Sequence, residues 1–527
     1  MSRTSRPRHP INPREADTVR PIPSWMSAAT GQVLAVLLLA AVSGVAPAAP
    51  SPTLEARVLP PPAKPGEALQ PYVRVAPGRV LLNHVALIDG SGAAAVPDRS
   101  ILIEAGRIVA VHAAQAAPPA DVKVLELSGH TVFPGIVGMH DHLYYIGRPN
   151  LDAAAHSDPP LLAPQMTYSA PRLYLANGVT TMRTTGSVEP YADLNLKRLI
   201  DAGELPGPHI DATAPYLEGS HSYFIQMHQL KDAEDARRTV AYWADEGATS
   251  FKAYMNITRA ELKAAITEAH RRGLKVTGHL CAVTYPEAAA LGIDDLEHGF
   301  FVNTQLDPGK QPDVCPDSNG MPTLLAMAPD GAPAAQLIAD LLAHHVAVTS
   351  TLPVFEQLVP QHAPLWPRAL EVLTPQAREA YLYLRNRTNM LPAEKAKERL
   401  TAYQHDLGLE RRFAAAGGLL LSGPDPTGNG GVIPGFGDLR GIELLVEAGF
   451  SVPEAIRIAT LNGATYLGLA ARIGSIAPGK DADLVVVAGD PTHTLTDIEN
   501  VELVFKDGVG YDSAALLASV KGRYGQY

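Results

Sequence analysis

The sequence predicts an α/β protein: a (β/α)8 TIM barrel with a small β-sandwich domain built from both ends of the chain. Three observations support this prediction. Strand-like and helix-like segments alternate over residues 134–468, β-rich segments lie on both sides of that region, and no G-x-G-x-x-G turn follows its first strand. An open doubly wound sheet would usually carry such a phosphate-binding turn, so the alternation favours a closed barrel.

The chain begins with the organisation of a targeting segment. Residues 1–25 carry five arginines against two acidic residues, an apolar run from Val33 to Val42 follows, and Ala46-Pro47-Ala48 offers a small-x-small cleavage site. The apolar run is shorter than the roughly 20 residues that a membrane span needs. We therefore expect a signal peptide over 1–48, a periplasmic or secreted protein, and no stable membrane span after cleavage; an uncleaved anchor is the alternative. Residues 49–77, rich in Pro and Ala, predict a linker.

The two β-rich regions predict one small sheet domain. In residues 78–133, apolar strands flank Ala105-Gly106, which is a hairpin signal. Residues 469–515 contain a matching set of strands over 482–487 and 501–505. We expect the two parts to pair with each other in the β-sandwich.

Within the barrel region one helix can be located closely. Thr258-x-x-Glu261 is a capping box, and Gly273 ends the helix before the next strand. Its apolar face is predicted to consist of Leu262, Ala265, Ile266 and Ala269. Two longer segments, 303–335 after the sixth strand and 354–410 after the seventh, should lie over the mouth of the barrel and shape substrate choice.

Charge and cysteine content narrow the class of protein. The formal net charge is -11, and no basic stripe lies beyond the N-terminus, which argues against nucleic acid as a partner. The only cysteines are Cys281 and Cys315. They could pair in an exported protein, and Cys281 could serve as a ligand or nucleophile. The sequence favours a small buried residue near the site.

Residue types that commonly bind metal ions stand at the ends of the predicted strands. His140 and His142 lie two residues apart in Pro134–His142, so an extended backbone would direct both imidazoles to one face. Four further candidates each end a predicted strand: Lys252, His279, His298 and Asp425. Each also has a simpler explanation, as a lysine in an ion pair, as core histidines or as a turn former. Because active sites of TIM barrels lie at the C-terminal ends of the strands, the set predicts a metal-dependent hydrolase.

The ordered set of six resembles the amidohydrolase superfamily. Ala459–Ala464 and Gly474–Leu484 are similar to the segments that return this superfamily's chain to its β-sandwich. A fourth-strand lysine followed by two histidines is similar to the Xaa-Pro dipeptidase and ochratoxin-amidase branch. Imidazolonepropionase-like proteins share many of these sequence motifs but typically have one metal and no lysine ligand.

The resemblance implies two divalent metal ions, with zinc expected from the imidazole and carboxylate ligands. His140, His142 and Asp425 would hold one ion, and His279 and His298 the other. Lys252, carboxylated on its side-chain nitrogen, would bridge the two. Asp425 would also transfer the proton of the bridging hydroxide or water to the leaving amine.

Three residues are candidates for contact with substrate. Tyr254 shares the strand face of Lys252 and could meet a substrate carboxylate. His221 lies in Gly-Ser-His, where relatives have Gly-Gly-His, and could polarise the carbonyl. Arg183 ends the second strand, where a structural ion pair is at least as good an explanation.

The sequence therefore predicts an exported amidohydrolase that cleaves an amide or peptide C–N bond in a dipeptide or N-acyl amino acid. A mononuclear imidazolonepropionase-like hydrolase is the alternative enzyme, and a barrel that only binds ligand is the alternative without catalysis. We further expect a homo-oligomer.

Overall fold

The computed structural model describes residues 53–525 except 115–119, 148–160, 223 and 428–431. The predicted signal peptide lies outside the described residues. Among those described, no helix is both long enough and apolar enough to cross a membrane.

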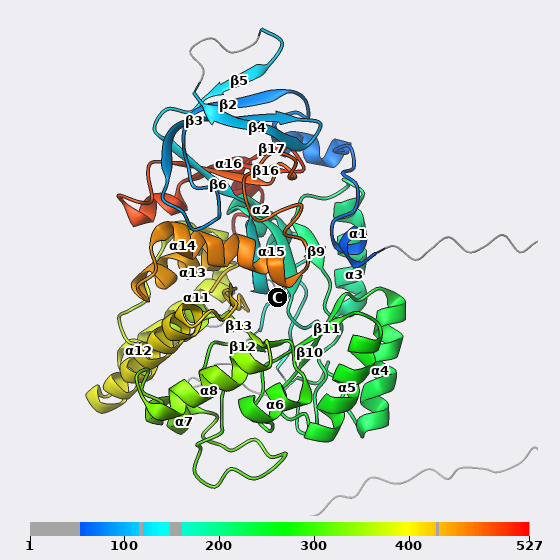
Figure 1. Cartoon of the computed structure of the whole chain (residues 1–527), viewed down its shortest axis with the longest axis vertical. Coiled ribbons are helices and arrows are strands. Elements are labelled where there is room, and N and C mark those ends of the chain that lie inside the picture. The colour runs from blue at the N-terminus through cyan, green and yellow to red at the C-terminus, as the bar shows by residue number, and fades with distance from the viewer. Residues whose placement is uncertain (1–52, 115–119, 148–160, 223, 428–431, 526–527) are drawn as a thin grey trace, which may run out of the picture. The chain divides into compact units, whose positions relative to one another are not determined.

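Eight parallel strands form the central barrel (Figure 1). They are β7 (Ile136–Asp141), β8 (Val179–Thr184), β9 (His209–Asp211), β10 (Ser250–Ala253), β11 (Lys275–Gly278), β12 (Asp295–Glu297), β13 (Ala347–Ser350) and β14 (Leu420–Ser422). β7 to β9 form one set and β10 to β14 another, and the bridge between Thr213 and Ser250 connects them. The ring closes beyond β14, where the amide of Asp425 donates to the carbonyl of His140 at 3.1 Å.

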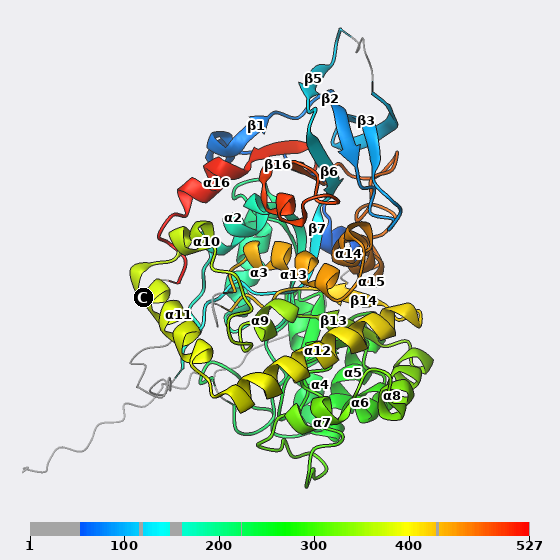
Figure 2. The same ribbon diagram turned by 90° about the vertical axis from the view of Figure 1, so that its left-hand side faces the viewer.

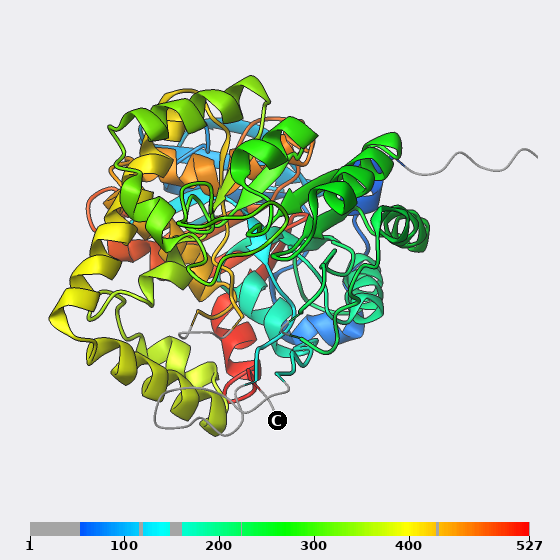
Figure 3. The same ribbon diagram turned by 90° about the horizontal axis from the view of Figure 1, so that it is seen from below.

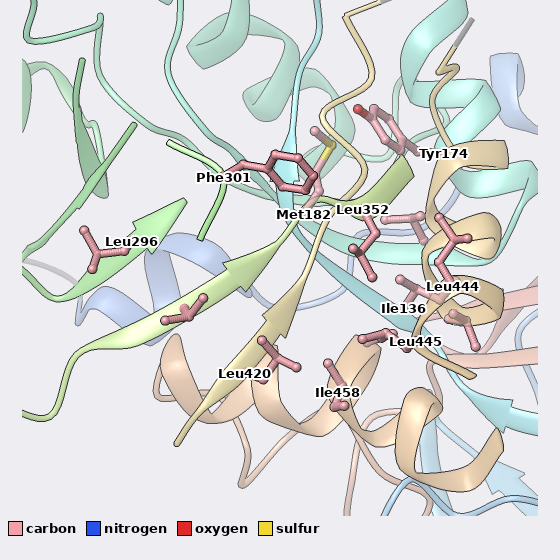
Figure 4. Packing of buried hydrophobic residues seen from close by; sticks show 14 of the residues in the cluster. Ile136, Tyr174, Met182, Leu296, Phe301, Leu352, Leu420, Leu444, Leu445 and Ile458 are labelled. Atoms are coloured by element: carbon pink, nitrogen blue, oxygen red, sulfur yellow. The ribbon is translucent and has the colours of Figure 1, made fainter. Parts of the chain in front are cut away.

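Helices between the strands surround the barrel, as the view from below shows (Figure 3). They include α2 (Ser169–Ala176), α3 (Pro190–Asp201), α4 (Ala233–Glu246), α5 (Arg259–Arg271), α6 (Tyr285–Leu291) and α13 (Phe436–Glu447). The capping box predicted for α5 is present, with Thr258 as N-cap. Apolar side chains of the strands, such as Ile136, Met182 and Leu420, pack with Leu444 of α13 and with Ile458 (Figure 4).

The β-sandwich sheet combines both ends of the described chain (Figures 1 and 2). β15 pairs antiparallel with β6 and with β16, so segments more than 300 residues apart share one sheet, as the sequence predicts. The sheet order is β1 (Val73–Val75), β17 (Val509–Asp512), β16 (Val501–Lys506), β15 (Leu484–Ala488), β6 (His130–Pro134), β2 (Val80–Leu87), β3 (Val96–Glu104) and β4 (Arg107–Ala113), with β5 (Lys123–Glu126) beside β2.

The segment expected as a linker is folded from Thr53 onward, so this part of the prediction is wrong. It forms α1 (Leu54–Val58), a 3-10 helix η1 (Glu67–Tyr72) and β1. Val58 and Leu59 are buried against strands β7 and β14 of the barrel. The Pro- and Ala-rich composition suggested a linker although the segment contains these apolar residues. Their burial stabilises the segment on the barrel.

The two long segments after β12 and β13 are helical. The first contains α7 (Met321–Ala326) and α8 (Ala332–Ala343), and the second contains α9 (Leu352–Glu356), α10 (Pro367–Val372), α11 (Pro375–Asn389) and α12 (Ala393–Ala415). Cys315 in the first segment forms a disulfide with Cys281, which follows β11. The sequence left the pairing of the two cysteines open and favoured a small buried Cys281; the structure pairs them, and Cys281 is buried.

The C-terminal part of the described chain also contains α14 (Val452–Arg457), a π-helix η3 (Ile458–Asn462), α15 (Gly463–Tyr466), a 3-10 helix η4 (Leu495–Glu499) and α16 (Ser513–Ser519).

Candidate metal centre

The six predicted ligands meet at the C-terminal ends of the barrel strands. His140 lies in β7 and His142 directly follows it; Lys252 is in β10, and His279 and His298 come directly after β11 and β12. Asp425 follows β14 by three residues. All six line one cavity of about 220 Å³. The structure thus brings together every residue of the predicted ligand set.

The backbone at the end of β14 is shaped for this approach. A Cβ atom on Gly423 would lie only 2.1 Å from the amide nitrogen of His140, so only glycine allows the two segments to come this close. Asp425 itself has φ of 55°, in the left-handed region that aspartate tolerates better than most residues. These two features place the carboxylate beside the first-strand histidines.

Distances between the side chains are those of a ligand cluster. The Oδ1 atom of Asp425 lies 3.1 Å from Nε2 of His142 and 3.6 Å from Nε2 of His140. The Nζ atom of Lys252 lies 3.1 Å from Nε2 of His140. The ring of His298 is 4.3 Å from that of His279 and 4.6 Å from that of His140, between centroids.

Two buried nitrogens support the fit to a metal. Nε2 of His279 and Nε2 of His298 have no hydrogen-bond partner among the described residues, which is costly unless a ligand takes them. On the other side of the ring, Nδ1 of His298 contacts the Thr351 hydroxyl at 2.9 Å. Nitrogen and carboxylate donors in one buried cluster suit zinc or a similar divalent ion.

Glu297, which was not among the predicted site residues, orients His140. Its Oε2 lies 2.7 Å from Nδ1 of His140, a contact that fixes the proton on Nδ1 and leaves Nε2 free for a metal. Glu297 precedes His298 by one residue and lies two residues after Asp295, on the same face of β12. An acidic i, i+2 pair ending a strand beside a candidate ligand was the available signal.

Burial keeps the histidines neutral, which metal binding requires. It lowers the pKa of His279 to about 3, with the nearby Lys252 acting in the same direction. The pKa values of His140 and His298 are also well below the usual range because of burial.

Lys252 and Asp425 are shifted in ways that suit their predicted roles. Burial lowers the pKa of Lys252 to about 8, against the opposing charge of Glu297, so a substantial fraction of its amine is neutral near pH 8. Burial opposes the charge of Asp425, but His140, a hydrogen bond from His142 and Lys252 hold its pKa well below the ordinary value.

Of the three candidates for substrate contact, only Tyr254 lines the cavity, with its ring 5.0 Å from that of His279. Arg183 is buried beneath the site, where its Nη2 contacts Asp295 at 2.7 Å and Glu297 at 2.8 Å. It therefore supports Glu297, and its proposed contact with substrate is corrected.

His221 is exposed and does not line the cavity, so the candidate role for it is corrected as well. Its backbone has φ of 72°, and its amide donates to Gln229. The Gly-Ser-His sequence turns outward at this point and carries the imidazole to the surface.

The rest of the cavity wall is aromatic and apolar. It is formed by Tyr144, Ile146, Tyr216, Phe224, Tyr254, Val354, Phe355, Leu358 and Thr427. The hydroxyls of Tyr144 and Tyr216 are 2.5 Å apart. Val354, Phe355 and Leu358 belong to the second long segment, which therefore contributes to the site as expected.

Comparison with known proteins agrees with this geometry. The model of the amidohydrolase family matches residues 131–396 and 417–509. An imidazolonepropionase from Phocaeicola vulgatus is 48% identical over 61 residues, a match that spans only 11% of this chain and 15% of that relative.

Two solved structures share the fold across most of the chain. A Xaa-Pro dipeptidase with methionine bound in its active site has a TM-score of 0.60 and 20% identity, covering 82% of this chain and 100% of that one. The ochratoxinase of A. niger has a TM-score of 0.58 and 16% identity, covering 82% and 96%. These similarities confirm the predicted fold class, a TIM barrel with a β-sandwich.

Proposed function

We propose a specific reaction for this chain, which belongs to the amidohydrolase family of metal-dependent hydrolases acting on C–N bonds. The proposed substrate is a dipeptide or N-acyl amino acid, whose amide or peptide bond is cleaved. The proposed cofactors are two divalent metal ions, most simply zinc. The observation that carries this proposal is the convergence of six ligand-type side chains on one cavity, two of them with buried ring nitrogens unpaired among the described residues. Bound divalent ions would polarise the scissile carbonyl and acidify water.

The residues divide the work by position. His140, His142 and Asp425 have ligand atoms within 4.8 Å of one another and would hold one ion. His279 and His298, whose rings adjoin, would hold the other. We assign the bridge to Lys252: its neutral amine adds to the carbon of CO₂ and loses a proton, which gives a carbamate with two oxygens.

We assign the proton transfer to Asp425. Its pKa is held low, so the ionised carboxylate, which is the form able to accept a proton from the attacking water, is the form present. The same group then returns that proton to the nitrogen of the departing amine, which leaves as a neutral product.

The proposal is tested by metal analysis and a substrate panel. Zinc-reconstituted protein should contain two ions per chain by mass spectrometry and release amine from dipeptides or N-acyl amino acids. One ion per chain, with hydrolysis restricted to cyclic amides or amidines, would instead favour the mononuclear imidazolonepropionase-like alternative.

A substitution of the bridging residue sharpens the test. Lys252→Ala should lose one ion and nearly all activity, since an anionic bridge offsets repulsion between two dications. A short carboxylic acid in solution should restore part of the rate. Lys275→Ala is the control. Lys275 lies at the N-terminal end of β11, away from the metal centre, where its amine contacts Tyr466, and this variant should keep both ions. Two ions and a near-normal rate in Lys252→Ala would rule out the bridge.

A further inference from the structure

The ionisable side chains of the described cavity wall, tyrosines aside, all belong to the metal centre: His140, His142, Lys252, His279, His298 and Asp425. The one carboxylate among them, that of Asp425, is already in contact with two histidines. No carboxylate of the described wall is therefore available to pair with an ammonium group of a substrate. Placing an unpaired ammonium in such a cavity is costly because its hydration is lost.

One part of the wall is built to receive an apolar group. Phe355 is stacked on Phe301, with ring centroids 3.8 Å apart and planes within 4° of parallel, so its position is fixed. Val354 and Leu358 flank it on the same segment, and Phe224 adds a second aromatic ring. Rigid aromatic and branched side chains favour an aromatic or branched apolar partner.

The apolar character continues outward from Phe224. Phe224 forms an isolated β-bridge with Leu161, and the residue that follows each of the two is exposed: Ile225 by 70% and Leu162 by 48%. An apolar group that extends beyond the cavity would therefore still meet apolar surface.

We propose that this site selects substrates whose acyl portion is apolar and uncharged, so that among the two substrate classes above it favours N-acyl amino acids over dipeptides with a free α-ammonium. The inference rests on the proposed function and narrows it.

A matched pair of substrates tests this directly. 3-Phenylpropanoyl-leucine and phenylalanyl-leucine differ only in the α-ammonium group. For the zinc-loaded enzyme at pH 7, kcat/KM should be at least about tenfold higher for 3-phenylpropanoyl-leucine, given the cost of desolvating an unpaired charge. The ratio should fall at pH 9, because the α-amino group of the dipeptide loses its proton near pH 8 while the wall is common to both substrates.

Variants locate the selection on the wall. Leu358→Glu places a carboxylate there and should shift the ratio toward phenylalanyl-leucine by about tenfold. Leu365→Glu, an exposed control on the same segment that does not line the cavity, should leave the ratio unchanged. The pH series on the unaltered enzyme carries the test even if Leu358→Glu folds poorly.

The outcomes separate the two proposals. Equal or better hydrolysis of phenylalanyl-leucine at pH 7, or a ratio that does not respond to pH, overturns the acyl-group inference and leaves amide hydrolysis in place. A well-folded, metal-loaded Leu358→Glu with an unchanged ratio also overturns it. Failure of the zinc-loaded enzyme on both substrates and on the wider amide panel overturns the proposed function itself.

Discussion

Asp425 has two separable roles in the proposed reaction, ligand and proton carrier. Asp425→Asn keeps the shape and one oxygen donor but cannot accept a proton. At saturating zinc, kcat should fall by about 10²–10⁴-fold, the usual contribution of general acid–base catalysis, while metal content measured by mass spectrometry changes little.

The histidines provide the contrast. Substitution of His279 should weaken metal affinity, and part of its activity should return with excess zinc. If Asp425→Asn were fully rescued by added zinc in the same way, Asp425 would be a ligand only, and the base would lie elsewhere.

The ligands were predictable at the residue scale because barrel geometry collects strand ends, and each ligand stands at one. Residues one layer further out were not. Glu297 and Arg183 act through contacts between different strands. Glu297 lies 2.7 Å from His140. Arg183 lies 2.7 Å from Asp295 and 2.9 Å from the Met139 carbonyl. His221 failed for a local reason, since a left-handed backbone at that residue turns it to solvent.

At the scale of elements, the disulfide holds the segment after β12 to the end of β11. Cys281 and Cys315 are 34 residues apart in sequence. Closing a loop of that length should contribute about 3–4 kcal/mol through the unfolded state. Cys315→Ser should therefore lower the melting temperature, and dithiothreitol should lower that of the unaltered protein but not of the variant. Equal melting of both proteins under oxidising conditions would contradict this.

A histidine bound between two carboxylates also holds α9, the helix that contains Phe355, in place. Nδ1 of His362 lies 2.8 Å from Glu356 at the end of α9, and Nε2 lies 3.0 Å from Glu447 of α13. Hydrogen bonds to these two carboxylates raise the pKa of His362 to about 9, against the opposing effect of burial.

The sign of the resulting pH dependence follows from that raised pKa. The stabilisation is complete below the unfolded value near 6.5 and is lost as the pH rises through about 9. His362→Gln should therefore cost about 1–3 kcal/mol at pH 6 and much less at pH 10. Melting temperatures of both proteins at both pH values measure this. His493→Gln, which alters an exposed histidine–aspartate pair, is the control and should have little effect at either pH.

Prediction of individual elements succeeded where the signal was local. The α5 capping box and the hairpin at Ala105-Gly106 depend on neighbouring residues alone, and both are present. The prediction of a linker failed between Thr53 and Val75 because the few apolar residues there are buried by residues far away in the sequence. Val58 and Leu59, for instance, pack with residues of β7 and β14.

At the scale of the whole molecule, the sandwich sheet depends on both chain ends, since β6 pairs with β15 and β1 with β17. The sequence suggested this because two β-rich regions surround one alternating region. It could not supply the register, which is fixed by side-chain packing across the sheet, as in the pairing of Phe133 with Val485.

We propose that the mature protein begins near residue 49 or 50 and lies outside the cytoplasm. The arginine-bearing start, the short apolar run and Ala46-Pro47-Ala48 motivate cleavage there. Disulfides persist mainly in oxidising compartments, so the Cys281–Cys315 bond supports the same location.

N-terminal sequencing of protein from the envelope fraction should read from residue 49 or 50. A chain produced without residues 1–48 should melt at the same temperature as the uncleaved chain, because the packing of α1 and β1 is retained. Recovery of protein with intact Met1 from the cytosol, with both cysteines reduced, would argue decisively against export. The disulfide would then have to be explained as a feature that forms only after extraction.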